Sequence, residues 1–376
     1  MQLPPLSLYI HIPWCVRKCP YCDFNSHQAP LQLPETEYVN ALLGEFDRRC
    51  DALHDREIGS VFFGGGTPSL FSPDAIGSVI DQLDRRLRWA ADVEITLEAN
   101  PGTVDRQRFA GFRTAGVNRL SIGVQSFDDA LLRALGRIHG GSEALTAIEA
   151  AHSAGFSRVN VDLMYGLPGQ STAQALADLR AAIACGIGHL SWYELTIEPN
   201  TAFYNAPPAL PQEDHLAAME AEGRSLLAAA GYERYEISAY ARPAQACRHN
   251  LNYWQFGDYL GLGAGAHSKL TDPTTGRICR TWNTRVPADY LGSARDQPAG
   301  RRELAAAELP VEFMMNALRL SHGVAAGCFE ARTGLALNAL QPALSQLRER
   351  GLLAAGDRLC TTTQGSRFLD SVLACF

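Results

Sequence analysis

Alternating strand-like and helical segments in the first half of the chain restrict its fold most. Short apolar runs are separated by longer segments that have helical periodicity and contain good helix formers such as alanine. The expected strands are residues 6–12, 60–63, 93–98, 117–122, 158–163 and 189–195, and the expected helices between them include residues 35–53, 73–87 and 172–184. Strand–helix units in series predict an α/β fold with a parallel sheet covered by helices.

Right-handed crossovers curl such a series into a barrel or an incomplete barrel. We expect an incomplete parallel (β/α)6 barrel, in which functional groups gather at the carboxyl ends of the strands. The candidate residues follow this rule. Those at the ends of the first five expected strands are Cys15, the glycine run 64–66, Glu98, Gln125 and Asp162.

Three closely spaced cysteines, Cys15, Cys19 and Cys22, follow the first expected strand. Thiolates are the usual ligands of iron–sulfur clusters, and a cubane of four irons held by three of them keeps one iron open for a small ligand. The loop also contains two basic residues and a proline, so it is a poor core segment, and nearby cations lower a thiol pKa. Buried core thiols and a zinc ligand set remain alternatives.

A glycine run follows the second expected strand, at Gly64, Gly65 and Gly66, and leads into Thr67 and Pro68. It lacks the lysine of a phosphate-binding loop, but its glycines allow the backbone to approach a ligand closely. A tight strand-to-helix turn is the simpler explanation. A second glycine-rich stretch, residues 261–265, resembles a dinucleotide loop only weakly because no strand–turn–helix setting surrounds it.

The second half of the chain has a looser pattern. We expect a core over residues 1–237, a linking region with a binding motif over residues 238–300, and a C-terminal module over residues 301–376. Helical segments at 304–319, 323–333 and 337–351, followed by two short apolar pieces, predict a small winged-helix-like module. The acidic chain favours a packing or partner-binding role for this module over DNA binding.

Composition excludes several classes of function. The formal net charge of −7 argues against a general nucleic-acid-binding surface. No apolar run is long enough for a transmembrane segment, and ten cysteines diluted over 376 residues, three of them clustered, indicate a reducing compartment. We therefore expect a cytoplasmic globular protein.

The CxxxCxxC spacing after a first strand resembles the radical S-adenosylmethionine (SAM) superfamily, in which SAM occupies the open iron. The resemblance implies a [4Fe-4S] cluster on Cys15, Cys19 and Cys22, SAM as a cofactor, and a radical SAM core over residues 1–237. Further motifs resemble the oxygen-independent coproporphyrinogen dehydrogenase branch. That resemblance places Tyr9, Gly65, Gly66, Thr67 and Glu98 around the cluster-bound SAM, and Gln125, Arg137 and Asp162 around a second SAM.

A further motif points to heme. Residues 247–254 contain the pattern HNxxYW, which resembles the signature of a heme-chaperone subgroup of this superfamily. The resemblance implies that His249, Asn250, Tyr253 and Trp254 bind heme. An imidazole suits heme iron, aromatic rings suit a macrocycle, and the neighbouring Arg248 suits a propionate. An ordinary core histidine with packing aromatics remains the alternative.

The chain departs from the coproporphyrinogen enzyme at two places. Phe24 stands where that enzyme has a further cysteine, and the long N-terminal extension is missing before the first strand. Our first hypothesis is therefore a heme chaperone that passes heme to acceptor proteins, such as respiratory membrane enzymes. The alternatives are a coproporphyrinogen III dehydrogenase acting by radical oxidative decarboxylation, and a radical SAM enzyme with an unrelated small substrate. No residue is assigned a catalytic role.

Overall fold

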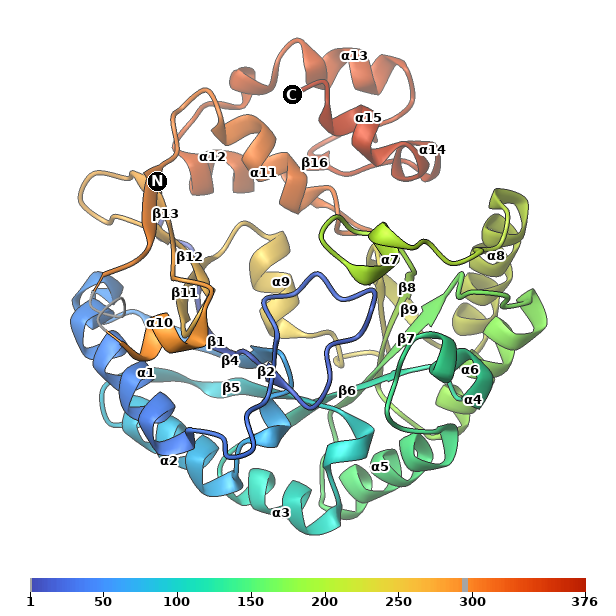
Figure 1. Ribbon diagram of the computed structural model, residues 1–376. Coiled ribbons are helices and arrows are strands. Elements are labelled where there is room, and N and C mark those ends of the chain that lie inside the picture. The colour runs from blue at the N-terminus through green and yellow to red at the C-terminus, as the bar shows by residue number, and fades with distance from the viewer. Residues whose placement is uncertain (1, 293–296) are drawn as a thin grey trace.

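A curved, open sheet forms the body of the protein, as Figure 1 shows for the computed structural model, which describes residues 2–292 and 297–376. Its central strands run in parallel and follow one another in chain order. They are β1 (Leu6–Ile12), β4 (Glu57–Gly65), β5 (Arg88–Ala99), β6 (Arg119–Gln125), β7 (Val159–Tyr165) and β8 (His189–Glu194). The six expected strands and the incomplete parallel barrel are thus confirmed.

The sheet continues past both ends of this parallel series. On one side β8 pairs with β10 (Ala239–Ala241), which pairs with β9 (Glu233–Glu236). On the other side β11 (Asp258–Leu262) pairs in parallel with β1. The strands beyond it are antiparallel: β12 (His267–Thr271), β13 (Ile278–Trp282) and β14 (Gly300–Glu303). Strands β10 to β13, which lie in the segment expected to link two domains, therefore belong to the main sheet.

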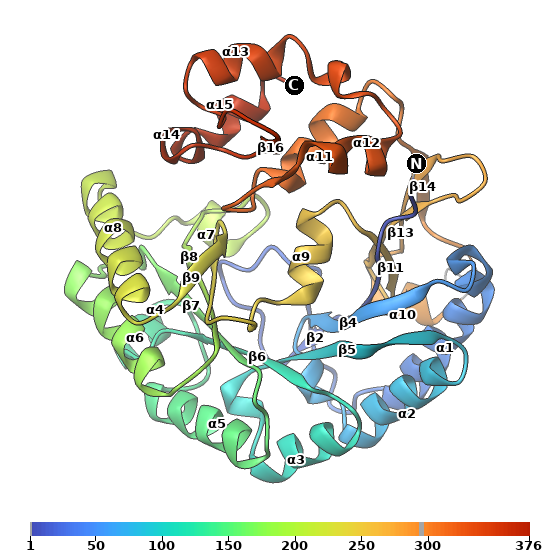
Figure 2. The same ribbon diagram turned by 180° about the vertical axis from the view of Figure 1, so that it is seen from behind.

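Helices cover the outer face of the sheet, as Figures 1 and 2 show from opposite sides. They are α1 (Glu35–Arg49), α2 (Pro73–Asp84), α3 (Arg106–Thr114), α4 (Asp129–Ala134), α5 (Gly141–Ser153), α6 (Thr172–Ala184) and α8 (Glu213–Ala229). Shorter elements are α7 (Ala202–Asn205), α9 (Arg248–Trp254), α10 (Pro287–Leu291), β2 (Trp14–Cys15), β3 (His27–Gln28) and 3-10 turns at Cys50–Leu53, Pro68–Leu70 and Pro101–Thr103.

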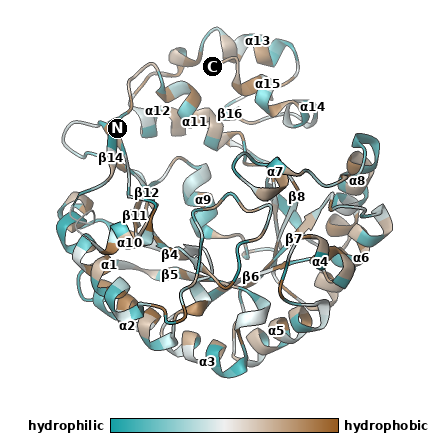
Figure 3. Cartoon of the chain, viewed as in Figure 1, coloured by the Kyte–Doolittle hydropathy of each residue, from teal (hydrophilic) through white to brown (hydrophobic). Residues whose placement is uncertain are grey.

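Local signals start these helices where the sequence predicts. The Ser72 hydroxyl accepts a hydrogen bond from the backbone of Ala75, and Ser171 and Gln174 form a capping box at the start of α6. Teal and brown segments alternate along the outer helices in Figure 3, as expected for amphipathic helices. Their apolar sides and the sheet enclose the main core, to which Leu8, Phe63 and Ile122 contribute.

The C-terminal module lies across the open side of the sheet. It contains α11 (Leu309–Ala317), α12 (Ala326–Thr333), a 3-10 turn (Leu337–Leu340), α13 (Ala343–Glu349), α14 (Thr363–Arg367) and α15 (Leu369–Leu373), with β15 (Val324–Ala325) antiparallel to β16 (Arg358–Leu359). The winged-helix-like arrangement is confirmed. Its first helix, expected from residue 304, begins at Leu309, because residues 306–308 form a turn and Pro310 stands in the first turn of the helix, where proline is tolerated. The module has its own core, which includes Phe313 and Phe329 and reaches Phe256 beside the sheet.

Within the described residues, no helix combines the length and the apolar character needed to cross a membrane.

One buried charge cluster ties β11 to its neighbours, and it yields a first prediction. Asp258 is fully buried and accepts hydrogen bonds from Arg56 Nη1 at 2.8 Å, Lys269 Nζ at 2.9 Å and the hydroxyl of Thr271 at 2.9 Å. Replacing Asp258 with alanine leaves the buried Lys269 without a counter-charge, so we expect the free energy of unfolding to fall by about 3–5 kcal/mol. Urea unfolding followed by circular dichroism measures this loss.

The exposed pair of Arg277 and Glu303 provides the control. Arg277→Ala should change the free energy of unfolding by less than about 1 kcal/mol because solvent screens this pair. Equal losses in both variants would show that the buried cluster does not hold the strands together.

Candidate metal centre

The cysteine loop lies above the carboxyl ends of the parallel strands. β2 and β3 pair in parallel and close the loop, with Trp14 opposite His27 and Cys15 opposite Gln28. Two backbone hydrogen bonds reinforce the closure, from His27 to Pro13 and from Ala29 to Cys15, at 2.7 and 2.8 Å. The three thiols therefore belong to one short, tied loop.

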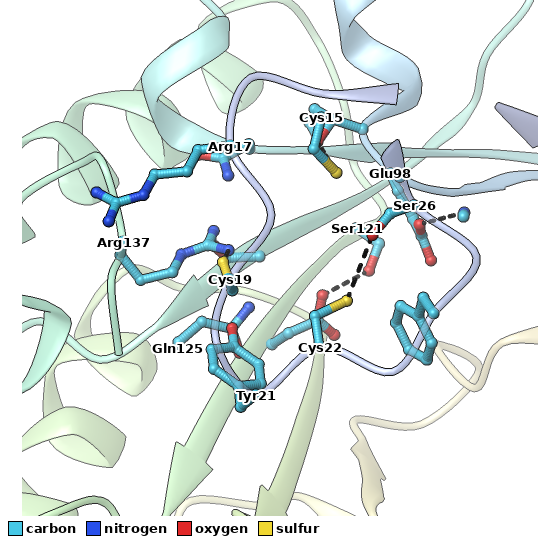
Figure 4. A pocket seen from close by; sticks show the side chains of 18 of the residues that line it. Cys15, Arg17, Cys19, Tyr21, Cys22, Ser26, Glu98, Ser121, Gln125 and Arg137 are labelled. Carbon is cyan, nitrogen blue, oxygen red and sulfur yellow. Dashed lines mark hydrogen bonds between the residues drawn. The ribbon is translucent and has the colours of Figure 1, made fainter. Parts of the chain in front are cut away.

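These thiols line a cavity of about 140 Å³, shown from close by in Figure 4. Seven other predicted site residues line the same cavity, from positions widely separated in the sequence. They are Gly65, Gly66, Thr67, Glu98, Gln125, Arg137 and Asp162. The ends of successive parallel strands meet here, which is why residues far apart in the chain become neighbours.

Polar groups surround the sulfur atoms. The Thr67 hydroxyl donates to Cys15 Sγ at 3.4 Å, and Arg137 Nη1 donates to Cys19 Sγ at 3.5 Å. Burial raises the pKa of Cys15 and of Cys22, so it outweighs the basic loop residues that were expected to lower a thiol pKa. Such thiols become thiolates when a metal replaces the proton.

The donor set suits a cluster. Within residues 2–292 and 297–376, no three His, Cys, Asp or Glu side chains are arranged to hold a single metal ion. Cys15, Cys19 and Cys22 nevertheless line one cavity from one loop. An iron–sulfur cubane takes its thiolates at separate irons. Three spaced thiols that accept hydrogen bonds fit such a cluster.

The glycine run acts as both a tight turn and a cavity wall. Gly65 has a φ of 114°, which favours glycine, and a Cβ on Gly66 would lie 2.6 Å from the carbonyl oxygen of Trp14. The backbone amides of Gly66 and Thr67 donate to the carbonyls of Ile12 and Trp14, both at 2.8 Å. The run therefore packs directly against the cysteine loop, and a side chain there would push the two apart.

Two buried carboxyl groups face the cavity. The backbone amide of Gly65 donates to Glu98 at 3.0 Å, and Ser121 and Asn160 donate to Asp162 at 3.1 and 2.7 Å. Burial, helped by the charge of Asp162, raises the pKa of Glu98 to about 8. Glu98 has no ion-pair partner among the described residues. A cationic cofactor such as the SAM sulfonium would stabilise the ionised form of this carboxyl group.

Arg137 and Gln125 form the opposite wall. Arg137 Nη2 donates to the carbonyl of Gly123 at 2.6 Å, while its buried Nε has no partner among the described residues. Gln125 has a φ of 71° and accepts a hydrogen bond from the Tyr193 hydroxyl at 2.9 Å. The structure brings these residues together with Asp162, and their contact with a second SAM stays a prediction.

Tyr9 lies in an adjoining cavity of about 530 Å³. The two cavities share Phe24, Gly65 and Glu98. Tyr253 of the HNxxYW motif also lines the second cavity. A ligand there would lie beside the cysteine cavity.

His249 and Trp254 of the HNxxYW motif pack against protein side chains and do not line this cavity. His249 is buried, its ring stacks on Phe62 with centroids 4.8 Å apart, and its Nδ1 is 3.3 Å from the Ser60 hydroxyl. Burial lowers the pKa of His249 to about 3, so the ring is neutral. Trp254 lies under the guanidinium of Arg319, 4.4 Å from ring centroid to Cζ. The role of His249 as an iron ligand stays a prediction.

The two polar members of the segment also have protein partners. Asn250 donates to the Tyr235 hydroxyl at 3.2 Å and lines a third, polar cavity. The guanidinium of Arg248 binds the carboxylate and the carbonyl of Asp92. Arg248 is therefore engaged in an exposed ion pair with β5 and does not line the cavity of Tyr253.

Sequence reasoning missed several residues that line the second cavity. They are Tyr259, His267 and Arg285. Phe24 was noted only as a departure from a pattern, yet its exposed ring lines all three cavities described above. The available signal was the glycine-rich stretch 261–265, whose last residue, Gly265, lines this cavity.

Comparisons with known proteins agree with this geometry. The family described as the radical SAM superfamily matches residues 9–182, and the HemN C-terminal domain matches residues 304–368. The chain is 49% identical to the heme chaperone HemW of Escherichia coli (strain K12), over 100% of this chain and 99% of that protein. It is 45% identical to the heme chaperone HemW of Haemophilus influenzae, over 100% and 98% of the two chains.

A solved structure shares the fold over most of the chain. Coproporphyrinogen III oxidase (HemN) from Escherichia coli, a radical SAM enzyme, superposes with a TM-score of 0.83. The match covers 99% of this chain and 90% of that chain, at 23% sequence identity. This likeness shows the fold, while the full-length sequence identity shows the family. The chain belongs to the HemW family of radical SAM proteins.

Proposed function

We propose that the protein is a heme chaperone that holds a [4Fe-4S] cluster with SAM and passes heme to acceptor proteins. The observation that carries the proposal is the aromatic cavity of about 530 Å³, which contains Tyr253 of the heme motif and adjoins the three-cysteine cavity. Ligand cavities commonly have volumes of about 300–1,000 Å³. The names of the full-length relatives support the same function.

The aromatic cavity suits a flat macrocycle. The rings of Tyr253 and Tyr259 stack with centroids 4.3 Å apart and planes 29° apart. Tyr9 and the exposed Phe24 add further aromatic surface to the same cavity. Aromatic faces give a large apolar contact at little entropic cost, and phenolic edges stay polar.

The cysteine cavity would hold the cofactors. Cys15, Cys19 and Cys22 would ligate the cluster, which when bound supplies a low-potential electron and an open iron for SAM. Glu98 would face the cationic part of the cluster-bound SAM, and Asp162 would contact a second SAM. Thr67 and Arg137 would donate hydrogen bonds to cluster thiolates. The proposed site of action is the cytoplasm, with acceptors that include respiratory membrane enzymes.

The cluster is tested by replacing each of Cys15, Cys19 and Cys22 with serine. After anaerobic reconstitution, we expect each variant to bind much less iron and sulfide than the wild type, because each of the three thiolates is needed to hold the cubane. Iron and sulfide analysis with visible absorbance measures the loss. Cys50→Ser, which changes a cysteine outside the cavity, is the matched control. Full cluster content in the three variants would contradict the assignment.

Heme handling is tested with the reconstituted wild-type protein and hemin. We expect the Soret band to shift when hemin binds. We also expect transfer of the bound heme to apo-myoglobin, a generic acceptor, because a chaperone must release its cargo. A parallel anaerobic assay with coproporphyrinogen III, SAM and a reductant should give no protoporphyrinogen. No Soret change, or decarboxylated product, would contradict the proposal and favour the dehydrogenase.

A further inference from the structure

The aromatic cavity contains a free metal-binding group that the heme motif does not include. The cavity lies between the cysteine loop and the strands β11 to β13, and its lining includes His11, His267 and Arg285 as well as the aromatic residues. The histidines near it differ in whether their ring nitrogens are available. Heme iron is commonly held by a neutral imidazole, so availability decides which histidine can serve.

His11 has both ring nitrogens engaged. Its Nε2 donates to the carbonyl of Asn25 at 2.8 Å, so its Nδ1 accepts from the Tyr9 hydroxyl at 3.0 Å. His27 similarly donates from Nε2 to the carbonyl of Arg285 at 3.1 Å. His249 lies beneath Tyr253 and Phe62, with ring centroids 4.9 and 4.8 Å away, and does not line the cavity. Iron ligation by His11 would therefore break a hydrogen bond that the fold already makes, and neither His27 nor His249 lines the cavity.

His267 is the exception. It begins β12, its side chain is exposed toward the cavity, and its ring makes no hydrogen bond to any described residue. Its ring stacks loosely on Trp282, with centroids 6.4 Å apart and planes 26° apart. Burial, with the charges of Arg280 and Arg285, lowers the pKa of His267. The imidazole is therefore neutral near pH 7, which is the form that binds iron.

Arg285 lies at the same cavity. Its backbone carbonyl is fixed by Asn25 Nδ2 at 2.9 Å, whereas its guanidinium has no hydrogen bond or ion pair with any described residue. The neighbouring Arg280 is already paired with Glu312 at 2.5 Å. A free guanidinium beside a macrocycle cavity matches a carboxylate in charge and shape.

We propose that heme binds in this cavity with His267 as an axial ligand and with Arg285 paired to a propionate. The inference rests on the proposed heme-binding function and names the residues that hold the cargo. Phe24, Gly65 and Glu98 line this cavity and the cysteine cavity together, so bound heme and bound SAM would be neighbours. HNxxYW would contribute Tyr253 to the wall and the buried His249 to the support behind it.

The test compares hemin binding by His267→Ala, His249→Ala and the wild type, each with its cluster reconstituted. Difference spectra against the same sample without hemin give the Soret position and the dissociation constant. We expect His267→Ala to weaken binding by at least about tenfold and to move the Soret band, since removing an axial ligand costs more than one contact. His215→Ala, which changes an exposed histidine on α8, is the control.

Imidazole rescue separates ligation from folding. In His267→Gly, added imidazole should occupy the vacated space and restore the wild-type Soret band, which a merely structural role would not allow. Arg285→Gln should bind hemin and its dimethyl ester equally, whereas the wild type should prefer hemin. The circular dichroism and melting temperature of each variant show that it is folded.

The outcomes distinguish the two levels of the proposal. A wild-type protein that binds no hemin contradicts the proposed function itself. Unchanged spectra and affinity in His267→Ala, together with hemin binding by the wild type, overturn the assignment of His267 but leave the function intact. Loss of the Soret shift in a folded His249→Ala variant alone would place the iron ligand in the HNxxYW motif instead.

Discussion

The pairing of β1 on both of its edges is the constraint on which the rest of the structure depends. β4 and β11 run parallel to it on either side, with Ile12 opposite Gly65 and Tyr9 opposite Gly261. The cysteine loop that follows β1 must therefore emerge between the ends of these two strands. One side of the loop meets the glycine run at the end of β4, and the other meets the turn after β11. Two adjoining cavities that share residues follow from this position.

The cysteine cavity contains buried ionisable groups that lack a partner of opposite charge. The thiols of Cys15 and Cys22 and the carboxyl group of Glu98 all have raised pKa values because they are removed from water. Burying a charge is costly unless a partner neutralises it. Iron suits the thiols, and a sulfonium suits the carboxyl groups. Removal from water disfavours the ionised form of these groups when they have no partner. The same low dielectric would strengthen their attraction to a cationic partner.

In helix α9, some residues of the HNxxYW segment pack against the rest of the protein and another lines the aromatic cavity. His249 and Trp254 face protein, the first against Phe62 and the second against Arg319 of the C-terminal module. Tyr253 faces the aromatic cavity and stacks on Tyr259. One short helix thus joins the sheet, the module and the cavity. Residues of a sequence signature need not all touch the ligand, because some of them fix the element that presents the others.

The sequence alone determined the order of strands and helices, the three-cysteine loop and the residues at the ends of β4 to β7. These features depend on local periodicity and on the rule that the ends of parallel strands share one edge, so they can be read without coordinates. β11 escaped prediction because two of its five residues are not apolar and one of those is glycine, which is uncommon within strands.

Only the tertiary structure decided that His267 and Arg285 lie beside Tyr9 and Phe24, and that His249 faces inward. Asn25 donates to the carbonyl of Ala264, 239 residues away in the chain, and contacts of this kind build the aromatic cavity. Periodicity reports whether a residue is buried within its own element. It does not report which distant segment covers that residue, because this depends on how the whole sheet closes.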